Sequence, residues 1–129
     1  HKPAKELTQM MTEEILNDKG YKRTVREWDN ESGNFVEKEL EDEAFESGDE
    51  LIVLVNSMGG TPLLELYIVY NELERLLKDK HFTMARNLIG PYITSLEMQG
   101  MSLTLVKADE EMLRLWDAPV NTPGLRWGV

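Results

Sequence analysis

The chain has 129 residues, which suits one domain with a modest core, and its hydrophobic content of 41% is ordinary for a globular protein. It contains no cysteine, which excludes disulfides and thiolate chemistry and favours a cytoplasmic location. A net charge of −10 repels phosphate groups, and no apolar run approaches the roughly 18 to 20 residues that span a bilayer, so neither nucleic acid nor a membrane is an expected partner.

The first part of the chain predicts a helix followed by a β-hairpin. Ala4 to Lys19 carries apolar residues at helical spacing. Tyr21 to Asp29 is rich in strand-forming residues, and Asn34 to Leu40 pairs back on it across a turn-forming segment. We expect Trp28 and Phe35 to pack against each other across that hairpin. The apolar positions of the helix are Leu7, Met10, Met11 and Ile15.

An acidic segment, Glu41 to Glu50, follows the hairpin. Carboxylates in a row could ligate a hard cation, but the segment lacks the D-x-D-x-D-G spacing of a calcium-binding loop. A solvated loop is the better interpretation of such a charge run. The chain also has no paired histidines, so we expect no metal site.

The stretch from Gly48 to Lys80 predicts a buried strand that leads into a helix. Leu51 to Val55 is an unbroken apolar run, and a glycine turn follows it. Thr61 and Pro62 are typical of a helix N-cap and of a first helical position. The first two turns of the helix are apolar on most sides, which predicts burial on several sides. These apolar residues are Leu63, Leu64, Leu66, Tyr67, Ile68, Val69 and Tyr70.

Two strands and a short helix are expected next. His81 to Ile89 and Met101 to Lys107 show the alternation of strands, and Tyr92 to Gln99 between them is interpreted as a short helix.

At the C-terminal end, Asp109 is expected to cap a helix from Glu110 to Trp116. The tail, 117–129, is rich in proline and glycine and is expected to be an extended, irregular arm. Together the elements predict the α/β class, with a single mixed β-sheet of four or five strands layered by helices, in one domain over residues 1–129.

The glycine turn after the buried strand is the one candidate binding site. Backbone N–H groups and the positive end of a helix dipole converge at such a turn, so a ligand oxygen or an anion could sit there. No lysine follows the glycines, which excludes a Walker-type phosphate loop. Glycine pairs are also common where a strand and a helix pack closely, and we favour that structural interpretation. The candidate residues are Asn56, Ser57, Gly59, Gly60 and Thr61, with Glu65 one helical turn further on.

Four segments carry a family resemblance. In order, they resemble the second half of the substrate-binding subunit of dihydroxyacetone (glycerone) kinases, over nearly the whole chain from about Tyr21. The ending Trp127-Gly128-Val129 is similar to the subunits of the phosphotransferase-linked type. The segments are YKRTVREWD, GDELIVLVNSMGGTPLLELYIVYNEL, ARNLIGPYITSLEMQGMSLTLVKAD and LWDAPVNTPGLRWGV.

The resemblance implies a subunit of two α/β domains, commonly a dimer, of which this chain is the second domain. It implies that dihydroxyacetone is held covalently on a histidine in a G-I-H-G-E-P-G-like motif, and that the nucleotide belongs to a separate subunit or domain. His1 is followed by Lys2-Pro3-Ala4 and not by Gly-Glu-Pro-Gly, so the covalent role is not carried over to His1. We therefore expect no catalytic residue and no cofactor in this chain.

Three functions follow from these expectations. The first is a part of dihydroxyacetone kinase that helps to bind dihydroxyacetone for phosphoryl transfer and is inactive alone, with the nucleotide-binding subunit and a second copy as partners. The second is a non-enzymatic paralogue that senses dihydroxyacetone and acts as a transcriptional co-activator. The third is a plain dimerisation domain, suggested by the apolar start of the helix at Leu63 to Tyr70.

Overall fold

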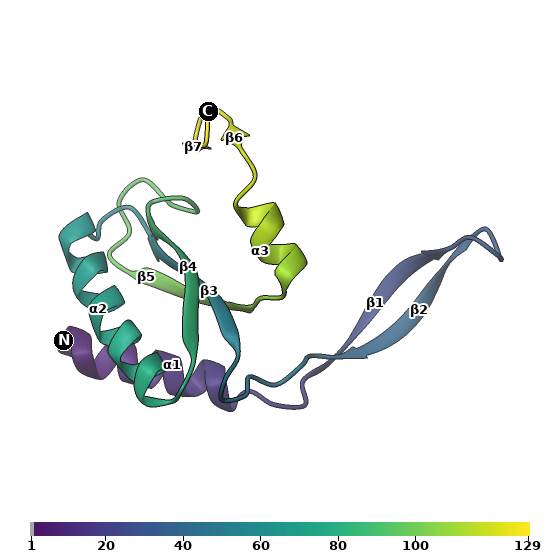
Figure 1. The fold of residues 1–129 in the computed structure, drawn as a ribbon, viewed down its shortest axis with the longest axis horizontal. Helices are drawn as coiled ribbons and strands as arrows, with labels where there is room; N and C mark the ends of the chain where they lie inside the picture. Colours follow the sequence, from purple (N-terminus) through teal and green to yellow (C-terminus); the bar gives the residue numbers. More distant parts are fainter. Residues whose placement is uncertain (1) are drawn as a thin grey trace.

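The computed structural model describes residues 2–129, so His1 lies outside the described residues (Figure 1). Three helices and seven strands follow one another along this part of the chain. They are α1 (Ala4–Asn17), β1 (Lys22–Asp29), β2 (Asn34–Glu41), β3 (Glu50–Ser57), α2 (Leu63–Asp79), β4 (Thr83–Gly90), β5 (Met101–Lys107), α3 (Glu110–Trp116), β6 (Val120–Asn121) and β7 (Arg126–Trp127). No helix of residues 2–129 has the length and hydropathy to cross a membrane.

A three-stranded mixed sheet forms the centre of the body. β3 is the middle strand, with β4 parallel to it on one side and β5 antiparallel to it on the other. The predicted α/β class with a mixed sheet is confirmed. The sheet has fewer strands than the predicted four or five, because β1 and β2, and likewise β6 and β7, pair only with each other in separate ribbons.

The core lies between this sheet and α2. Leu51, Val53 and Val55 of β3 are fully buried and form one cluster with four residues of α2. Ile52 on the opposite face of β3 is also buried, which explains why this central strand appears in the sequence as a continuous apolar run. The four α2 residues, Leu66, Val69, Leu73 and Leu77, are spaced as one helical face.

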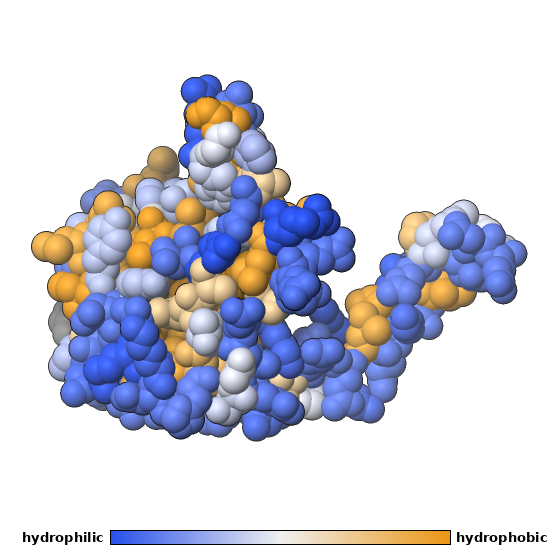
Figure 2. All heavy atoms as spheres, in the orientation of Figure 1, coloured by the Kyte–Doolittle hydropathy of each residue, from blue (hydrophilic) through white to orange (hydrophobic). Residues whose placement is uncertain are grey.

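The rest of the apolar surface of α2 is exposed at its first turns. The exposed fractions of Leu63, Leu64, Tyr67 and Ile68 are 47%, 71%, 50% and 48%. The prediction of burial on several sides is therefore wrong for these four residues, because the sheet and α1 together cover only part of the circumference of α2 within residues 2–129. Hydrophobic side chains are accordingly visible on the surface of the body (Figure 2).

Helix α1 packs against α2 with an unexpected face. Its buried residues include Thr8 and Thr12, whose hydroxyls donate to the carbonyl oxygens of Ala4 and Thr8, each at 2.7 Å. These i to i−4 bonds satisfy the hydroxyls and let a polar face enter the interior. The apolar positions Leu7 and Met10 remain 37% and 45% exposed, so the apolar face expected to be inward is partly open.

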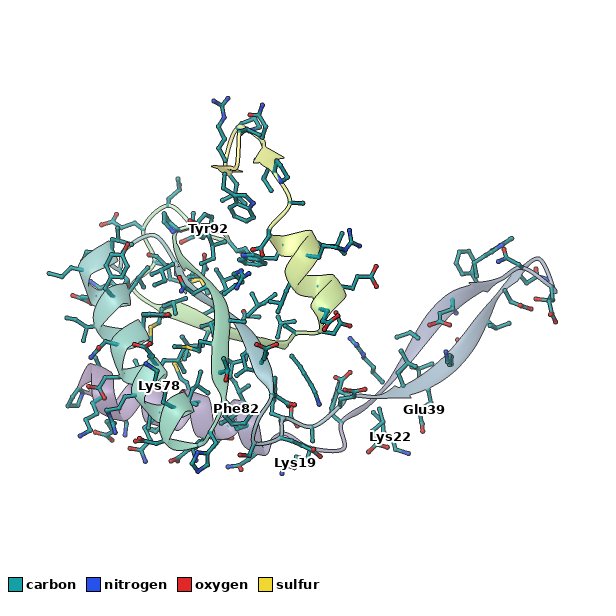
Figure 3. The ribbon with its side chains drawn as sticks, in the orientation of Figure 1. Lys19, Lys22, Glu39, Lys78, Phe82 and Tyr92 are labelled. Atoms are coloured by element: carbon teal, nitrogen blue, oxygen red, sulfur yellow. The ribbon has the colours of Figure 1, made fainter. Side chains whose placement is uncertain are left out.

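β1 and β2 form a long hairpin arm that projects away from the body (Figures 1 and 3). Trp28 and Phe35 contact edge to face, with ring centroids 5.3 Å apart, which confirms the predicted packing across the hairpin. Cross-strand ion pairs add to it, among them Lys22 with Glu39 at 3.1 Å. The arm makes no substantial contact with any other element.

The segment 91–100, between β4 and β5, contains no helix, so the helix predicted for Tyr92 to Gln99 is wrong. Its backbone groups bond instead to the end of β3, as described below. Helix α3 is confirmed together with its cap, because the side chain of Asp109 accepts from the amide of Met112 at 2.8 Å.

The tail 117–129 contains the small β6–β7 hairpin, whose Trp127 stacks on Trp116 with centroids 5.6 Å apart. Arg86 of β4 binds Asp117 through two hydrogen bonds of 2.6 and 2.5 Å, which fixes the end of α3 to the face of the sheet opposite α2. These contacts give the tail regular structure that its proline and glycine content did not predict.

Candidate functional site

The predicted site is the corner between β3 and α2, formed by residues 56–62. The structure brings its five candidate residues together at the end of the sheet. It also places the segment 91–100, with Tyr92 at its start, against them (Figure 3). A ligand could be bound only by polar groups of these residues that are not already hydrogen-bonded within the protein.

Asn56 is the most buried member of the corner, with an exposed fraction of 1%. Its side-chain nitrogen donates to the carbonyl oxygen of Ile93 at 2.7 Å and to the hydroxyl of Ser102 at 3.3 Å. Its Oδ1 accepts from the backbone amides of Tyr92 at 2.9 Å and Ile93 at 2.8 Å. Four hydrogen bonds use both donors and both lone-pair directions of the side-chain amide.

Ser57 and Thr61 close the turn in a similar way. The hydroxyl of Ser57 donates to the carbonyl oxygen of Thr61 at 2.8 Å and accepts from the amide of Gly59 at 3.0 Å. The hydroxyl of Thr61 donates to the carbonyl oxygen of Gly100 at 2.8 Å and accepts from the amide of Gly100 at 3.0 Å. The predicted N-cap role of Thr61 is therefore wrong: Pro62 is the N-cap of α2, and no side chain caps this helix.

The two glycines are required by the close approach of 91–100. Gly59 has a φ of +105°, and a Cβ built on it would lie 2.4 Å from the carbonyl oxygen of Ser95. A Cβ on Gly60 would lie 3.0 Å from the backbone carbon of Met98. The backbone of segment 91–100 therefore occupies the space that a side chain at either position would need.

Backbone hydrogen bonds complete the junction. The carbonyl oxygen of Met58 accepts from the hydroxyl of Ser95 at 2.6 Å and from the amide of Met98 at 3.2 Å, and its amide donates to Gly100. The amide of Gly60 donates to the carbonyl oxygen of Met98 at 2.8 Å. These long-range bonds compete with the i to i−4 bonds of a helix, which is why 92–99 does not become one.

Two hollows adjoin the corner. A small one of about 270 Å³ is lined mainly by apolar side chains beside Ser57 and Gly59. A larger one, of about 560 Å³, lies between α1 and the start of α2, and Lys2, Thr61 and Glu65 contribute its polar groups. The larger hollow has no signal in the sequence, because Lys2 and Glu65 are far apart in the chain and only the packing of α1 brings them to one place.

The acidic segment before β3 faces a lysine of the sheet. Lys107 lies 3.4 Å from Asp49 and 3.6 Å from Glu43. Among residues 2–129 there is no group of three histidine, aspartate or glutamate side chains that could hold a metal ion. The segment is thus tied to β5 by ion pairs.

Comparison with known proteins identifies the family. The model of the Dak1 domain matches residues 1–124. The chain belongs to the Dak1 domain family. It is 49% identical, over 118 residues, to the dihydroxyacetone-binding subunit DhaK of the PEP-dependent dihydroxyacetone kinase of Escherichia coli, and this match covers 92% of the chain and 33% of that protein.

Other relatives of the Dak1 domain are similar over shorter stretches or at lower identity. It is 34% identical to the DhaK subunit of the PTS-dependent kinase of Lactococcus lactis, over 88% of the chain and 34% of that protein. It is 43% identical to the L-erythrulose 1-kinase of Mycolicibacterium smegmatis, over 60% of the chain and 14% of that protein. The matches thus cover between about a quarter and a third of the length of the DhaK subunits.

A solved structure of the dihydroxyacetone kinase operon co-activator Dha-DhaQ shares the fold. The TM-score is 0.67 at 22% identity, over 92% of the chain and 30% of that protein. At this identity the likeness concerns the fold of the Dak1 domain alone.

Proposed function

We propose that this Dak1 domain is the second domain of the dihydroxyacetone-binding subunit of a phosphotransferase-linked dihydroxyacetone kinase. The observation that carries the proposal is the 49% identity to a DhaK subunit over 92% of the chain. Because the chain spans only 33% of that relative, the kinase activity belongs to a longer subunit, in which this domain is one part.

The geometry of the corner supports a scaffolding role for the domain within that subunit. The side chains of Asn56, Ser57 and Thr61 form their hydrogen bonds within the protein. A saturated, close-packed junction of this kind holds a neighbouring site in place and does not bind substrate through its own groups. The covalent histidine and the acid and base residues would then lie outside this chain, as the family resemblance implies.

The partners follow from the same assignment. Dihydroxyacetone is the substrate, a separate nucleotide-binding subunit supplies the phosphoryl group, and the binding subunit forms a homodimer in the cytoplasm. The domain itself carries no cofactor. Erythrulose kinases are also among the relatives, but their similarity covers a smaller share of the chain, which favours dihydroxyacetone as substrate.

A sensor function is the second candidate, and the likeness to the co-activator Dha-DhaQ favours it. A sensor would bind dihydroxyacetone without transferring phosphate. The kinase assignment has the stronger support, because the identity to kinase subunits is 49%, against 22% to the co-activator.

The proposal is tested with the full-length subunit and with the 129-residue chain. Each is incubated with dihydroxyacetone, the nucleotide-binding subunit and the phosphorylated phosphocarrier protein as phosphoryl donor, and dihydroxyacetone phosphate is followed by phosphorus NMR. We expect product from the full-length subunit and none from the chain alone. Binding of dihydroxyacetone without phosphorylation would support the sensor, and absence of both would overturn the two candidates together. A parallel reaction with erythrulose compares the substrates.

A further inference from the structure

Helix α1 and strand β5 leave an open apolar groove between them. Leu7, Met10 and Met11 of the helix face Met101 and Leu103 of the strand across a hollow of about 440 Å³. This hollow shares Leu7, Met11 and Met101 with the larger one beside the corner, so the two form one continuous groove. With Thr8 and Thr12 buried against the body, the larger apolar side chains of α1 line the groove.

The groove runs along an unpaired sheet edge. Within residues 2–129, β5 pairs with β3 on one side and with no strand on the other. The amide of Met58 donates to Gly100 and the amide of Ala108 donates to Glu50, so the even-numbered residues of β5 direct their backbone groups to β3. The N–H and C=O groups of residues 101, 103, 105 and 107 therefore point to the open edge, beneath the apolar side chains of α1.

An unpaired strand edge beside an apolar groove can bind an extended segment as an additional strand of the sheet. Backbone hydrogen bonds to β5 would then provide affinity, and alternate side chains of the segment would lie in the groove. The chain spans only a third of its DhaK relatives, so about two thirds of such a subunit lies outside these residues. Lys2 and Ala4, the first residues of the described chain, line the groove, so a preceding segment would enter it directly.

We propose that an extended segment from the remainder of the Dak1 subunit pairs with β5 and seats its apolar side chains against Leu7, Met10 and Met11. The lining of the groove defines the chemistry of that segment. Its centre is apolar, Glu14 at one end favours a basic residue there, and Lys2 and Glu65 at the other end favour a polar residue. This inference rests on the proposed function, because it assumes a subunit of the relatives' length.

Amide hydrogen exchange tests the pairing residue by residue, with an internal control in the same strand. In the 129-residue chain, we expect the amides of residues 102, 104 and 106 to be protected and those of 103, 105 and 107 to exchange quickly. In the full-length subunit the exchange of the amides of residues 103, 105 and 107 should become about a hundredfold slower, because hydrogen-bonded amides exchange only when the structure around them opens. Unchanged fast exchange of the odd-numbered amides in the full-length subunit would overturn the proposal.

A pair of variants identifies the occupant. Leu7→Glu in the full-length subunit places a charge in the groove and should restore fast exchange of the odd-numbered amides, whereas Val36→Glu on the hairpin arm should not. If those amides are instead protected in the 129-residue chain as its concentration rises, a second copy fills the groove and the proposal fails. The readout does not involve phosphoryl transfer, so an inactive subunit with a protected β5 would reject the proposed function and leave the pairing intact.

Discussion

Asn56 binds the backbone of Ile93 on both of its polar sides. The side-chain nitrogen of Asn56 donates to the Ile93 carbonyl oxygen at 2.7 Å, and Oδ1 accepts from the Ile93 amide at 2.8 Å. The pairing of β3 with β4 ends at Asn56 and Gly90. Beyond that point the hydrogen bonds of the Asn56 side chain replace backbone hydrogen bonds between the two segments. The start of segment 91–100 is therefore held by a single buried side chain, while its later residues bond to Met58, Gly60 and Thr61.

Replacing Asn56 with Ala should destabilise the domain by about 2 kcal/mol or more, because three partly buried backbone groups of Tyr92 and Ile93 lose their hydrogen-bond partner. Urea unfolding measures the loss. Asn87→Ala is the matched control, since Asn87 is exposed and makes one side-chain bond, to the Tyr70 hydroxyl at 3.0 Å. Equal stability losses in the two variants would contradict the role assigned to Asn56.

A glycine can be required by a positive φ or by backbone packed against its Cα, and comparison of Gly59 with Gly48 distinguishes these two causes. Both have a positive φ, +105° and +100°, but only Gly59 has backbone where a Cβ would stand. Gly48→Ala should therefore cost about 1 kcal/mol of conformational strain. Gly59→Ala should cost several times that amount and release segment 91–100, as seen by faster exchange of its amides. A cost for Gly59→Ala no greater than for Gly48→Ala would show that the two segments are not in close contact.

Local signals in the sequence predicted much of this fold. The continuous apolar run of β3, the turn between β1 and β2 and the cap at Asp109 each depend on residues that are neighbours in the chain, and all three are found in the structure. The corner was likewise predicted as one unit, with its close-packed interpretation favoured, and its hydrogen bonds and glycine contacts agree with that interpretation.

The features that the sequence did not predict depend on contacts between residues that are far apart in the chain. The hydroxyl of Thr61 binds Gly100 instead of capping α2, and segment 92–99 bonds to Met58 and Gly60 instead of forming a helix. The exposure of Leu64 was missed for a related reason. An apolar pattern indicates that a surface is buried in the complete assembly, but it does not indicate which part of that assembly covers it.

His81 is the only non-glycine residue of 2–129 with a positive φ, at 65°. It follows the end of α2, where its amide donates to Lys78 and the amide of Phe82 donates to Leu77, the pattern of a Schellman motif. Glycine suits this conformation better, so His81→Gly should stabilise the domain by about 0.5 to 1 kcal/mol. Thermal unfolding measures the gain. Lys80→Gly, one residue earlier at a φ of −92°, should be destabilising, and stabilisation by both changes would point to a cause other than the backbone.

The ion pair of Arg86 and Asp117 makes the attachment of α3 sensitive to acid. The hydrogen bond from Arg86 lowers the pKa of Asp117 below its ordinary value of 3.8. Because the pKa is lower in the folded than in the unfolded chain, the stabilising effect is present above the ordinary value and is lost as pH falls through the folded value. NMR titration of the Asp117 carboxyl should give a midpoint below 3.8, and Asp117→Asn should reduce the slope of stability against pH in that range. A midpoint at the ordinary value would contradict the pairing.

The hairpin arm has a consequence for how this family can change. The two chain ends of the arm meet at its root, where the amide of Asp42 donates to the carbonyl oxygen of Tyr21 at 2.9 Å. Since the arm has no substantial contact with the body, its residues 22–41 are free to lengthen, shorten or be replaced by a short turn without a cavity opening in the core. The length and sequence of the arm can therefore change during evolution independently of the sheet. They are constrained only by the surfaces that the arm contacts in the assembled protein.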